Sequence, residues 1–152
     1  MIRWIAGSGL LLFIVLFTLA SCGSSQKSLN ISEEEAVAFQ NKEADTVAIV
    51  DPDSKYEIII IEPGFNFWLR SIAQPRGYYS QNFLEIRNRI YVIEWNQRVM
   101  QPNRFDPLLY ELQINYDPQI DYGYEVNYKL YNYFIYFQRK YRQRLGPFIP
   151  RI

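Results

Sequence analysis

The sequence predicts a small α+β domain, with a three-stranded sheet packed by two to three helices, behind a cleaved signal peptide and a flexible tether. Three observations support this fold class. A short apolar block ends at a lone cysteine, three later segments have strand patterns, and others place apolar residues at helical spacing. The order β-β-α-α-β-α is typical of α+β folds and leaves the strand order open. We expect the signal in residues 1–21, the tether in 22–45 and the domain in 46–152.

The first segment has the composition of a secretory signal. Arg3 is the only charged residue among the first 26, residues 10–19 read LLLFIVLFTL, and small residues follow. The apolar stretch from Ile5 to Leu19 is shorter than the roughly 20 residues that a membrane-spanning helix needs. An uncleaved membrane anchor is therefore the less favoured alternative.

The signal ends at Leu19-Ala20-Ser21-Cys22, which resembles the lipobox of bacterial lipoprotein precursors. The resemblance implies that the Cys22 thiol accepts diacylglycerol, that a peptidase cuts before it, and that the new amine is acylated. Cys22 is the only cysteine, so it has no partner for an intramolecular disulfide. We expect acyl chains on Cys22 to hold the mature chain at a membrane.

The tether and two strands come next. Residues 23–45 begin with linker composition and include a weakly helical stretch for which Ser32 is placed as the N-cap. Residues 46–50 are β-branched and end in a turn cluster. Residues 56–61 contain four consecutive isoleucines, which suggests a central strand buried on both faces. We expect a hairpin between the two, with parallel pairing left open.

The remaining segments alternate between helical and strand patterns. Residues 65–73 predict a short helix, residues 80–100 a long helix with Ser80 as its N-cap, and residues 108–116 the third strand. The last helix is expected over residues 124–145, before Gly146-Pro147. The long helix is expected to bury the seam Phe83, Ile86, Ile90 and Ile93, flanked by Leu84, Tyr91 and Trp95. The last helix is expected to bury the seam Val126, Leu130, Phe134, Phe137 and Tyr141.

Composition excludes several classes of function. Lys+Arg and Asp+Glu are both 16, so nothing indicates nucleic acid as a partner. The chain has no histidine, which removes Ser-His nucleophiles and histidine-bearing zinc sites, and no phosphate or calcium loop, so we expect no cofactor or metal. Carboxylates remain for acid–base chemistry: Glu62, Glu85, Glu94, Asp117 and Asp121. Helical ion pairs from Glu85 to Arg89 and from Glu94 to Arg98, together with aspartate caps, explain them more simply.

Tyrosine is unusually frequent, with 13 in the chain. Those around the last helix suit either a binding interface or a core with hydroxyls at its rim, and the second explanation is favoured. The basic residues 139–144 suit a solvated helix end that opposes the helix dipole better than they suit anionic lipid.

The boldest prediction is a binding surface where residues 63–65 and the loop 117–124 approach each other. Both segments leave strand ends, where loops on a rigid sheet commonly bind. The residues expected to supply hydrogen bonds are Asn66, Asp121, Glu125 and Asn127. Those expected to supply contact area are Trp68, Tyr122 and Tyr124. The alternative is that these residues only shape turns and cap helices.

Three segments carry a further resemblance: EIIIIEPGFNFWL at 57–69, YYS at 78–80 and YGYEVNYKLYNYF at 122–134. Together they resemble an uncharacterised lipoprotein family typical of Bacteroidetes, over about residues 55–145. The resemblance implies the cell envelope but no activity. In lipoproteins of that group, export to the cell surface usually goes with acidic residues soon after the cysteine. Residues 23–28 have none, so the resemblance implies an outer-membrane anchor facing the periplasm. We therefore expect a non-enzymatic module that binds an envelope protein or polymer; the alternative is a carboxylate-based hydrolase of glycan or peptidoglycan.

Overall fold

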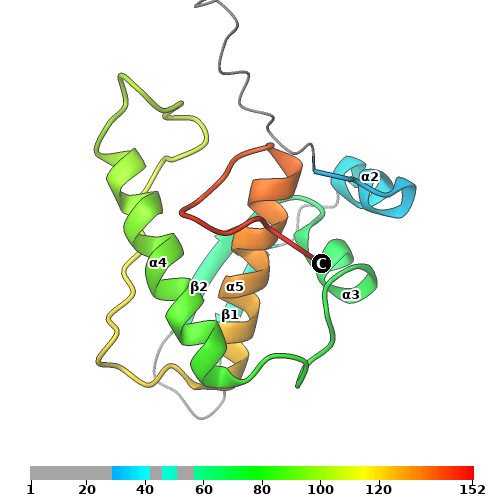
Figure 1. Cartoon of the computed structure of the whole chain (residues 1–152), viewed down its shortest axis with the longest axis horizontal. Helices are drawn as coiled ribbons and strands as arrows, with labels where there is room; N and C mark the ends of the chain where they lie inside the picture. The colour runs from blue at the N-terminus through cyan, green and yellow to red at the C-terminus, as the bar shows by residue number, and fades with distance from the viewer. Residues whose placement is uncertain (1–28, 42–45, 51–56) are drawn as a thin grey trace, which may run out of the picture.

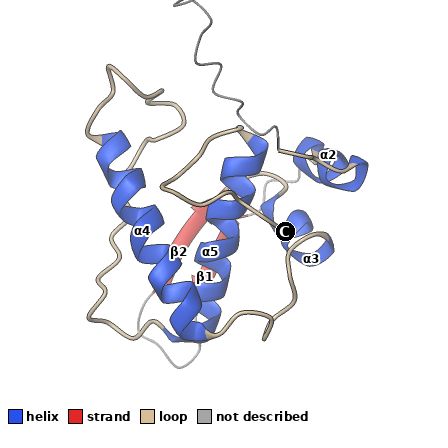
Figure 2. Ribbon diagram, viewed as in Figure 1, coloured by secondary structure: helices blue, strands red, loops and turns tan. Residues whose placement is uncertain are grey.

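The computed structural model describes residues 29–41, 46–50 and 57–152, and this part of the chain is mainly helical (Figures 1 and 2). The helices are α2 (Glu33–Gln40), α3 (Phe65–Ser71), α4 (Gln81–Val99) and α5 (Gly123–Lys140). The strands are β1 (Thr46–Val50) and β2 (Glu57–Ile61). Figure 1 shows α4 and α5 side by side with the strands behind them. In the described segments, no helix has both the length and the apolar content that crossing a bilayer requires.

The predicted α+β class with a three-stranded sheet is wrong. β1 and β2 form an antiparallel hairpin in which Thr46 pairs with Ile61 and Val50 with Glu57. Within the described residues no third strand joins them. The predicted strand at residues 108–116 is a loop. The described part of the chain is therefore a mostly helical fold with one hairpin.

Residues 108–116 stay irregular because side chains of α4 satisfy their backbone groups. The indole Nε1 of Trp95 donates to the carbonyl of Leu112 at 2.9 Å. The side-chain amide of Asn96 makes two hydrogen bonds with the backbone of Ile114. Its Nδ2 donates to the Ile114 carbonyl at 3.0 Å, and its Oδ1 accepts from the Ile114 N–H at 2.8 Å. Backbone groups with such partners need no neighbouring strand. The face expected for a strand is not kept, since Tyr110 is buried while Leu112, two residues further on, is exposed.

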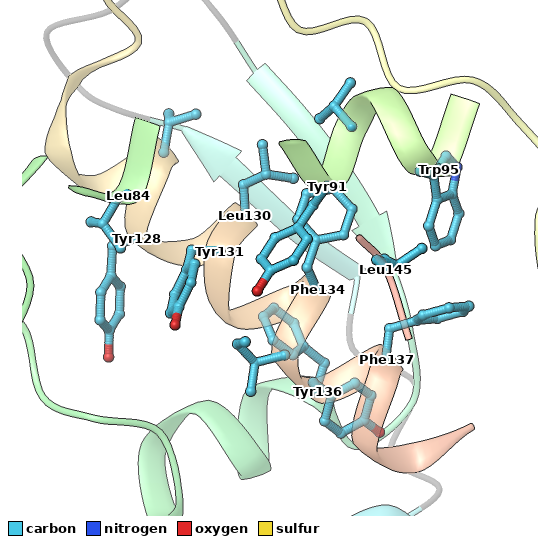
Figure 3. Close-up of a cluster of buried hydrophobic side chains, with 14 of the residues drawn as sticks. Leu84, Tyr91, Trp95, Tyr128, Leu130, Tyr131, Phe134, Tyr136, Phe137 and Leu145 are labelled. Atoms are coloured by element: carbon cyan, nitrogen blue, oxygen red, sulfur yellow. The ribbon is translucent and has the colours of Figure 1, made fainter. Parts of the chain in front are cut away.

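α4 and α5 run parallel and share an aromatic core (Figure 3). Tyr91 packs against Phe134 with ring centroids 5.4 Å apart, and Trp95 against Phe137 at 4.8 Å. The contacts advance together along both helices, as they do only in a parallel pair. The core placement of the tyrosines around the last helix is confirmed for four of them, all buried: Tyr122, Tyr128, Tyr131 and Tyr136.

The predicted core face is right for α5 and wrong for α4. Four residues of the predicted α5 seam are buried, and Tyr141 is half-buried. On α4, Ile86 and Ile93 are 52% and 53% exposed, and the centre of the buried face is shifted to the predicted flanking residues Leu84, Tyr91 and Trp95, together with Asn88. Hydropathy alone misplaces this face because the core of α4 contains a polar residue, Asn88, that bonds to α5.

α5 ends at Lys140, five residues before the predicted end. Arg142 has φ 50° and Gly146 has φ 69°, so the chain leaves the helical conformation and turns back. The turn brings Leu145 into the core, where it is fully buried. Its N–H donates to Oε1 of Gln138 at 2.7 Å. A buried leucine therefore continues the apolar pattern past the end of the helix.

The described part of the predicted tether packs on the domain. Ser32 caps α2 as expected, with its Oγ accepting from the N–H of Glu35 at 3.2 Å. Glu35 and Ala38 are fully buried, and α2 packs against α3. Gly64, with φ 83°, lies so close that a Cβ there would come within 2.6 Å of the Ala38 carbonyl oxygen. Residues 29–41, which the sequence assigns to the tether, therefore pack closely against the helices of the domain.

Candidate functional site

A polar cleft lies where α4 and α5 begin. Its volume is about 340 Å³, which is within the range of about 300–1,000 Å³ typical of ligand pockets. The first turns of α4 form one side, and the end of the 100–122 loop forms the other. The lining residues are Gln81, Glu85, Arg89, Tyr116, Pro118, Gln119, Ile120 and Asp121.

Gln81 brings two carboxylates together in this cleft. Its Nε2 donates to Oε1 of Glu85 at 2.8 Å and to Oδ1 of Asp121 at 2.9 Å. Glu85 is one turn further along α4, whereas Asp121 belongs to the loop before α5 and also accepts from the N–H of Gly123. Because one nitrogen binds both oxygens within normal hydrogen-bond range, the two oxygens lie less than about 6 Å apart. A ligand with two donors could reach both carboxylates.

Tyr116 lines the cleft and is held in place by its neighbours. Its hydroxyl donates to Oδ1 of Asn127 at 2.8 Å, and its ring stacks on Tyr122 with centroids 4.9 Å apart. Burial raises the pKa of Tyr116 to about 12, and the charge of Glu85 adds to this effect. The phenol is therefore protonated at neutral pH. Its donated proton points to Asn127, so the ring offers mainly contact area to a ligand.

Asn127 is a structural residue and not a surface ligand. It is fully buried on α5. Asn88 Nδ2 donates to the backbone carbonyl of Asn127 at 3.0 Å and to its Oδ1 at 3.1 Å, while Asn127 Nδ2 donates to the carbonyl of Gly123. The same Oδ1 accepts from Tyr116. These bonds fix α4, α5 and the cleft loop relative to one another.

The other predicted residues at the start of α5 bind protein groups outside the cleft. Glu125 accepts two bonds from Arg76, at 2.8 and 2.6 Å, and the hydrogen bond lowers the pKa of Glu125. The Tyr124 hydroxyl accepts from the N–H of Gly77 at 2.6 Å. The buried Tyr122 accepts through its hydroxyl from the N–H of Asp117 at 2.9 Å. Of the predicted site residues, only Asp121 lines the cleft.

The predicted meeting of the two loops does not occur. Pro63 lies near the end of α5, where its carbonyl accepts from the hydroxyl of Tyr136 at 2.7 Å, whereas the loop 117–124 lies at the start. Thirteen residues of helix separate Gly123 from Tyr136, or about 20 Å at 1.5 Å per residue. Trp68 is fully buried and donates to Glu35 at 3.2 Å, and Asn66 is on the same short helix, α3. Trp68 and Asn66 therefore do not share a site with Asp121.

Sequence reasoning missed three cleft residues, Gln81, Arg89 and Tyr116, and considered Glu85 as a catalytic carboxylate or, more simply, as an ion-pair partner of Arg89. A signal was present, because Gln81, Glu85 and Arg89 recur at four-residue intervals on one side of α4. The predicted pair from Glu94 to Arg98 is confirmed at 2.8 Å. Glu85 instead accepts from Gln81. Tyr116 carries no such signal, since the pattern around it predicts a strand.

Comparison with known proteins adds a family to this description. The model of a family of unknown function, DUF6146, matches residues 10–148. No curated protein and no solved structure matches the chain. In the described segments, no three Asp, Glu, His or Cys side chains are grouped to hold a metal ion.

Proposed function

The chain belongs to the DUF6146 family, and we propose that it is a lipid-anchored protein of the bacterial cell envelope. In this proposal Cys22 carries the acyl chains, and the domain faces the periplasm from the outer membrane. The cleft at the start of α4 and α5 binds part of an envelope protein or polymer. The single observation that carries the binding role is the convergence of Glu85 and Asp121 on Gln81 in a cleft of ligand size.

The anchor is supported by the sequence before the domain. The motif Leu19-Ala20-Ser21-Cys22 follows an apolar block, and the family match begins inside that block at residue 10. The likeness to Bacteroidetes lipoproteins agrees with this interpretation. Two or three acyl chains bury enough methylene groups for stable attachment. A Cys22→Ser chain is expected to accumulate as an unlipidated full-length precursor, and normal acyl labelling of that chain would contradict the anchor.

The chemistry of the cleft favours a ligand rich in hydrogen-bond donors. Two carboxylates accept, and Arg89 adds one positive charge on the next turn of α4. Hydroxyl and amine groups of a glycan or peptide would suit this set, with Tyr116 and Ile120 as apolar contacts. Charge-assisted hydrogen bonds of this kind contribute more than neutral ones. We therefore expect Glu85 to contribute strongly to binding.

A photo-cross-linking residue at Gln119, which is exposed at the cleft, tests this role in cells. The matched control is Gln97, exposed on α4 away from the cleft. We expect a specific adduct from position 119 only, reduced about tenfold by Glu85→Gln, since hydrogen bonds to charged groups contribute on that scale. Equal adducts from both positions, or an adduct indifferent to Glu85→Gln, would count against the cleft as the binding site.

The second candidate is the carboxylate-based hydrolase. It is favoured by the spacing of Glu85 and Asp121, because the upper limit of about 6 Å between their oxygens allows the roughly 5–5.5 Å found between the carboxylates of retaining glycosidases. Release of reducing ends from peptidoglycan by the wild-type protein, abolished by Asp121→Asn while the cross-link from position 119 persists, would select the hydrolase. Binding without release would select the binding module.

A further inference from the structure

The end of the molecule where α4 and α5 finish has exposed apolar side chains. Met100, directly after α4, is 72% exposed, and Leu108, in the following loop, is 79% exposed. Arg104 lies between them in the sequence and is also exposed. Oδ1 of Asp106 accepts from the N–H of Leu108 at 2.9 Å, which shapes the tip of this loop. We call residues 100–108 the apical loop.

The apical loop lies at the end of the domain where the chain arrives from Cys22. Arg139, in the last turn of α5, donates through Nη2 to the carbonyl of Asn30 at 2.9 Å. Arg98, in the last turn of α4, donates to the carbonyl of Arg144. These bonds place the segment at Asn30, where the chain enters the domain, at the same end of the domain as the C-terminal ends of α4 and α5. Figure 1 shows the entry at the same end as the tips of α4 and α5.

The covalent distance from Cys22 to Asn30 limits how far this end can stand from the anchor. Eight residues separate the two positions, so a fully extended chain spans at most about 28 Å. α5, with 18 residues, is about as long, at 1.5 Å per residue. The tether therefore keeps the whole domain within about one helix length of the bilayer that holds Cys22, and the apical loop, at the end where the chain enters, can reach this bilayer with the least extension of the tether.

We propose that the apical loop docks on the lipid surface of the anchoring membrane, inserting Met100 and Leu108 among the headgroups with Arg104 near the phosphates. This inference rests on the proposed acylation of Cys22. Exposed Leu and Met side chains gain by leaving water at such an interface, and arginine pairs with phosphate. The docked loop would leave the cleft, at the other end of α4, facing away from the membrane.

The chain offers a clean test because Cys22 is its only cysteine. Once Cys22 is acylated, an introduced cysteine is the only free thiol. Leu108→Cys and Met100→Cys would carry a polarity-sensitive dye on the lipidated protein, reconstituted in vesicles with and without spin-labelled lipid. The matched control is Ile86→Cys, also exposed but near the start of α4.

We expect a blue shift and quenching by spin-labelled lipid at positions 108 and 100, and neither at position 86. Equal quenching at the three positions, or none, would overturn the docking while leaving the anchor intact. A blue shift of the dye at position 108 that depends on protein concentration and not on lipid would show that a second copy of the chain covers the loop. That result would also overturn the docking on lipid. Dye on the parent chain would reveal a free thiol at Cys22, and the anchor and the docking would fail together.

Discussion

Replacing Glu35 by alanine is expected to destabilise the fold strongly. Glu35 is fully buried on α2, and its carboxylate accepts from Arg139 Nε at 2.5 Å and from Nη2 at 2.6 Å. The indole of Trp68 donates to the same carboxylate at 3.2 Å. Arg139 is itself only 5% exposed and also donates to the carbonyls of Asn30 and Pro150. One guanidinium thus joins α2, α5 and both ends of the described domain.

The expected loss follows from what the substitution leaves behind. Without Glu35, the Arg139 charge stays buried with carbonyl partners only, and the Trp68 N–H loses its acceptor. Removing one partner of a buried ion pair costs about 3–5 kcal/mol. For a domain of this size, that corresponds to a fall in Tm on the order of 10 °C or more. Glu34→Ala, exposed on the same helix, is expected to change the free energy of unfolding by less than about 0.5 kcal/mol.

Urea denaturation followed by tryptophan fluorescence measures both variants. The paired substitution Glu35→Leu with Arg139→Met, measured beside its two single substitutions, forms a double-mutant cycle, and the pair should recover much of the loss because no charge is left buried. A Glu35→Ala protein within about 1 kcal/mol of wild type would refute the reasoning, since no buried pair loses a partner at so small a cost. Similar losses for Glu34→Ala and Glu35→Ala would assign the effect to the negative charge that each removes from the first turn of α2.

The other predictions concern the boundary, one glycine and the tyrosines. A chain starting at Thr46 lacks Glu35 and should unfold at lower urea than one starting at Leu29; equal midpoints would support the boundary at residue 46 that the sequence suggests. Gly64→Ala forces a Cβ against α2, whereas Gly77, with φ 85°, has open space around it; calorimetry should show a larger fall in Tm for Gly64→Ala, and matching values would contradict the close packing. Burial raises the pKa of Tyr116 to about 12, so the unfolded chain loses this proton first, near pH 10. The contribution of protonated Tyr116 to the free energy of unfolding is therefore fully present below pH 10. The free energy of unfolding should fall as the pH rises toward 12, and it should fall less steeply in Tyr116→Phe. A flat profile over pH 9–12 would contradict this expectation.

The helices were readable from the sequence because their signals are local. Ser32 and Ser80 were identified as N-caps, and their hydroxyls accept from Glu35 and Phe83 as that role requires. The short helix α3 and the body of α4 and α5 also follow from apolar spacing. A cap or a turn involves residues within one helical turn, so a single stretch of sequence contains both partners.

The sheet and the candidate site depended on contacts between distant segments. Residues 108–116 alternate as a strand does, but Trp95 and Asn96 satisfy their backbone first. The cleft requires Asp121 to meet Gln81, and the predicted surface fails because Pro63 lies beside Tyr136, far along α5 from the loop 117–124. No local pattern states which of these partners will meet.

Glu35 shows most clearly which features the local sequence determines and which depend on tertiary contacts. Its place three residues after Ser32 marks the start of a helix, and the backbone at that position behaves accordingly. The sequence by itself therefore determined that a helix begins there, as it determined the lone Cys22 behind an apolar block and the absence of histidine. Only the tertiary structure decided that the Glu35 carboxylate is buried against Arg139, 104 residues later. A carboxylate can leave water only where a cation and further donors surround it, and here the folding of α3 and α5 around α2 supplies them.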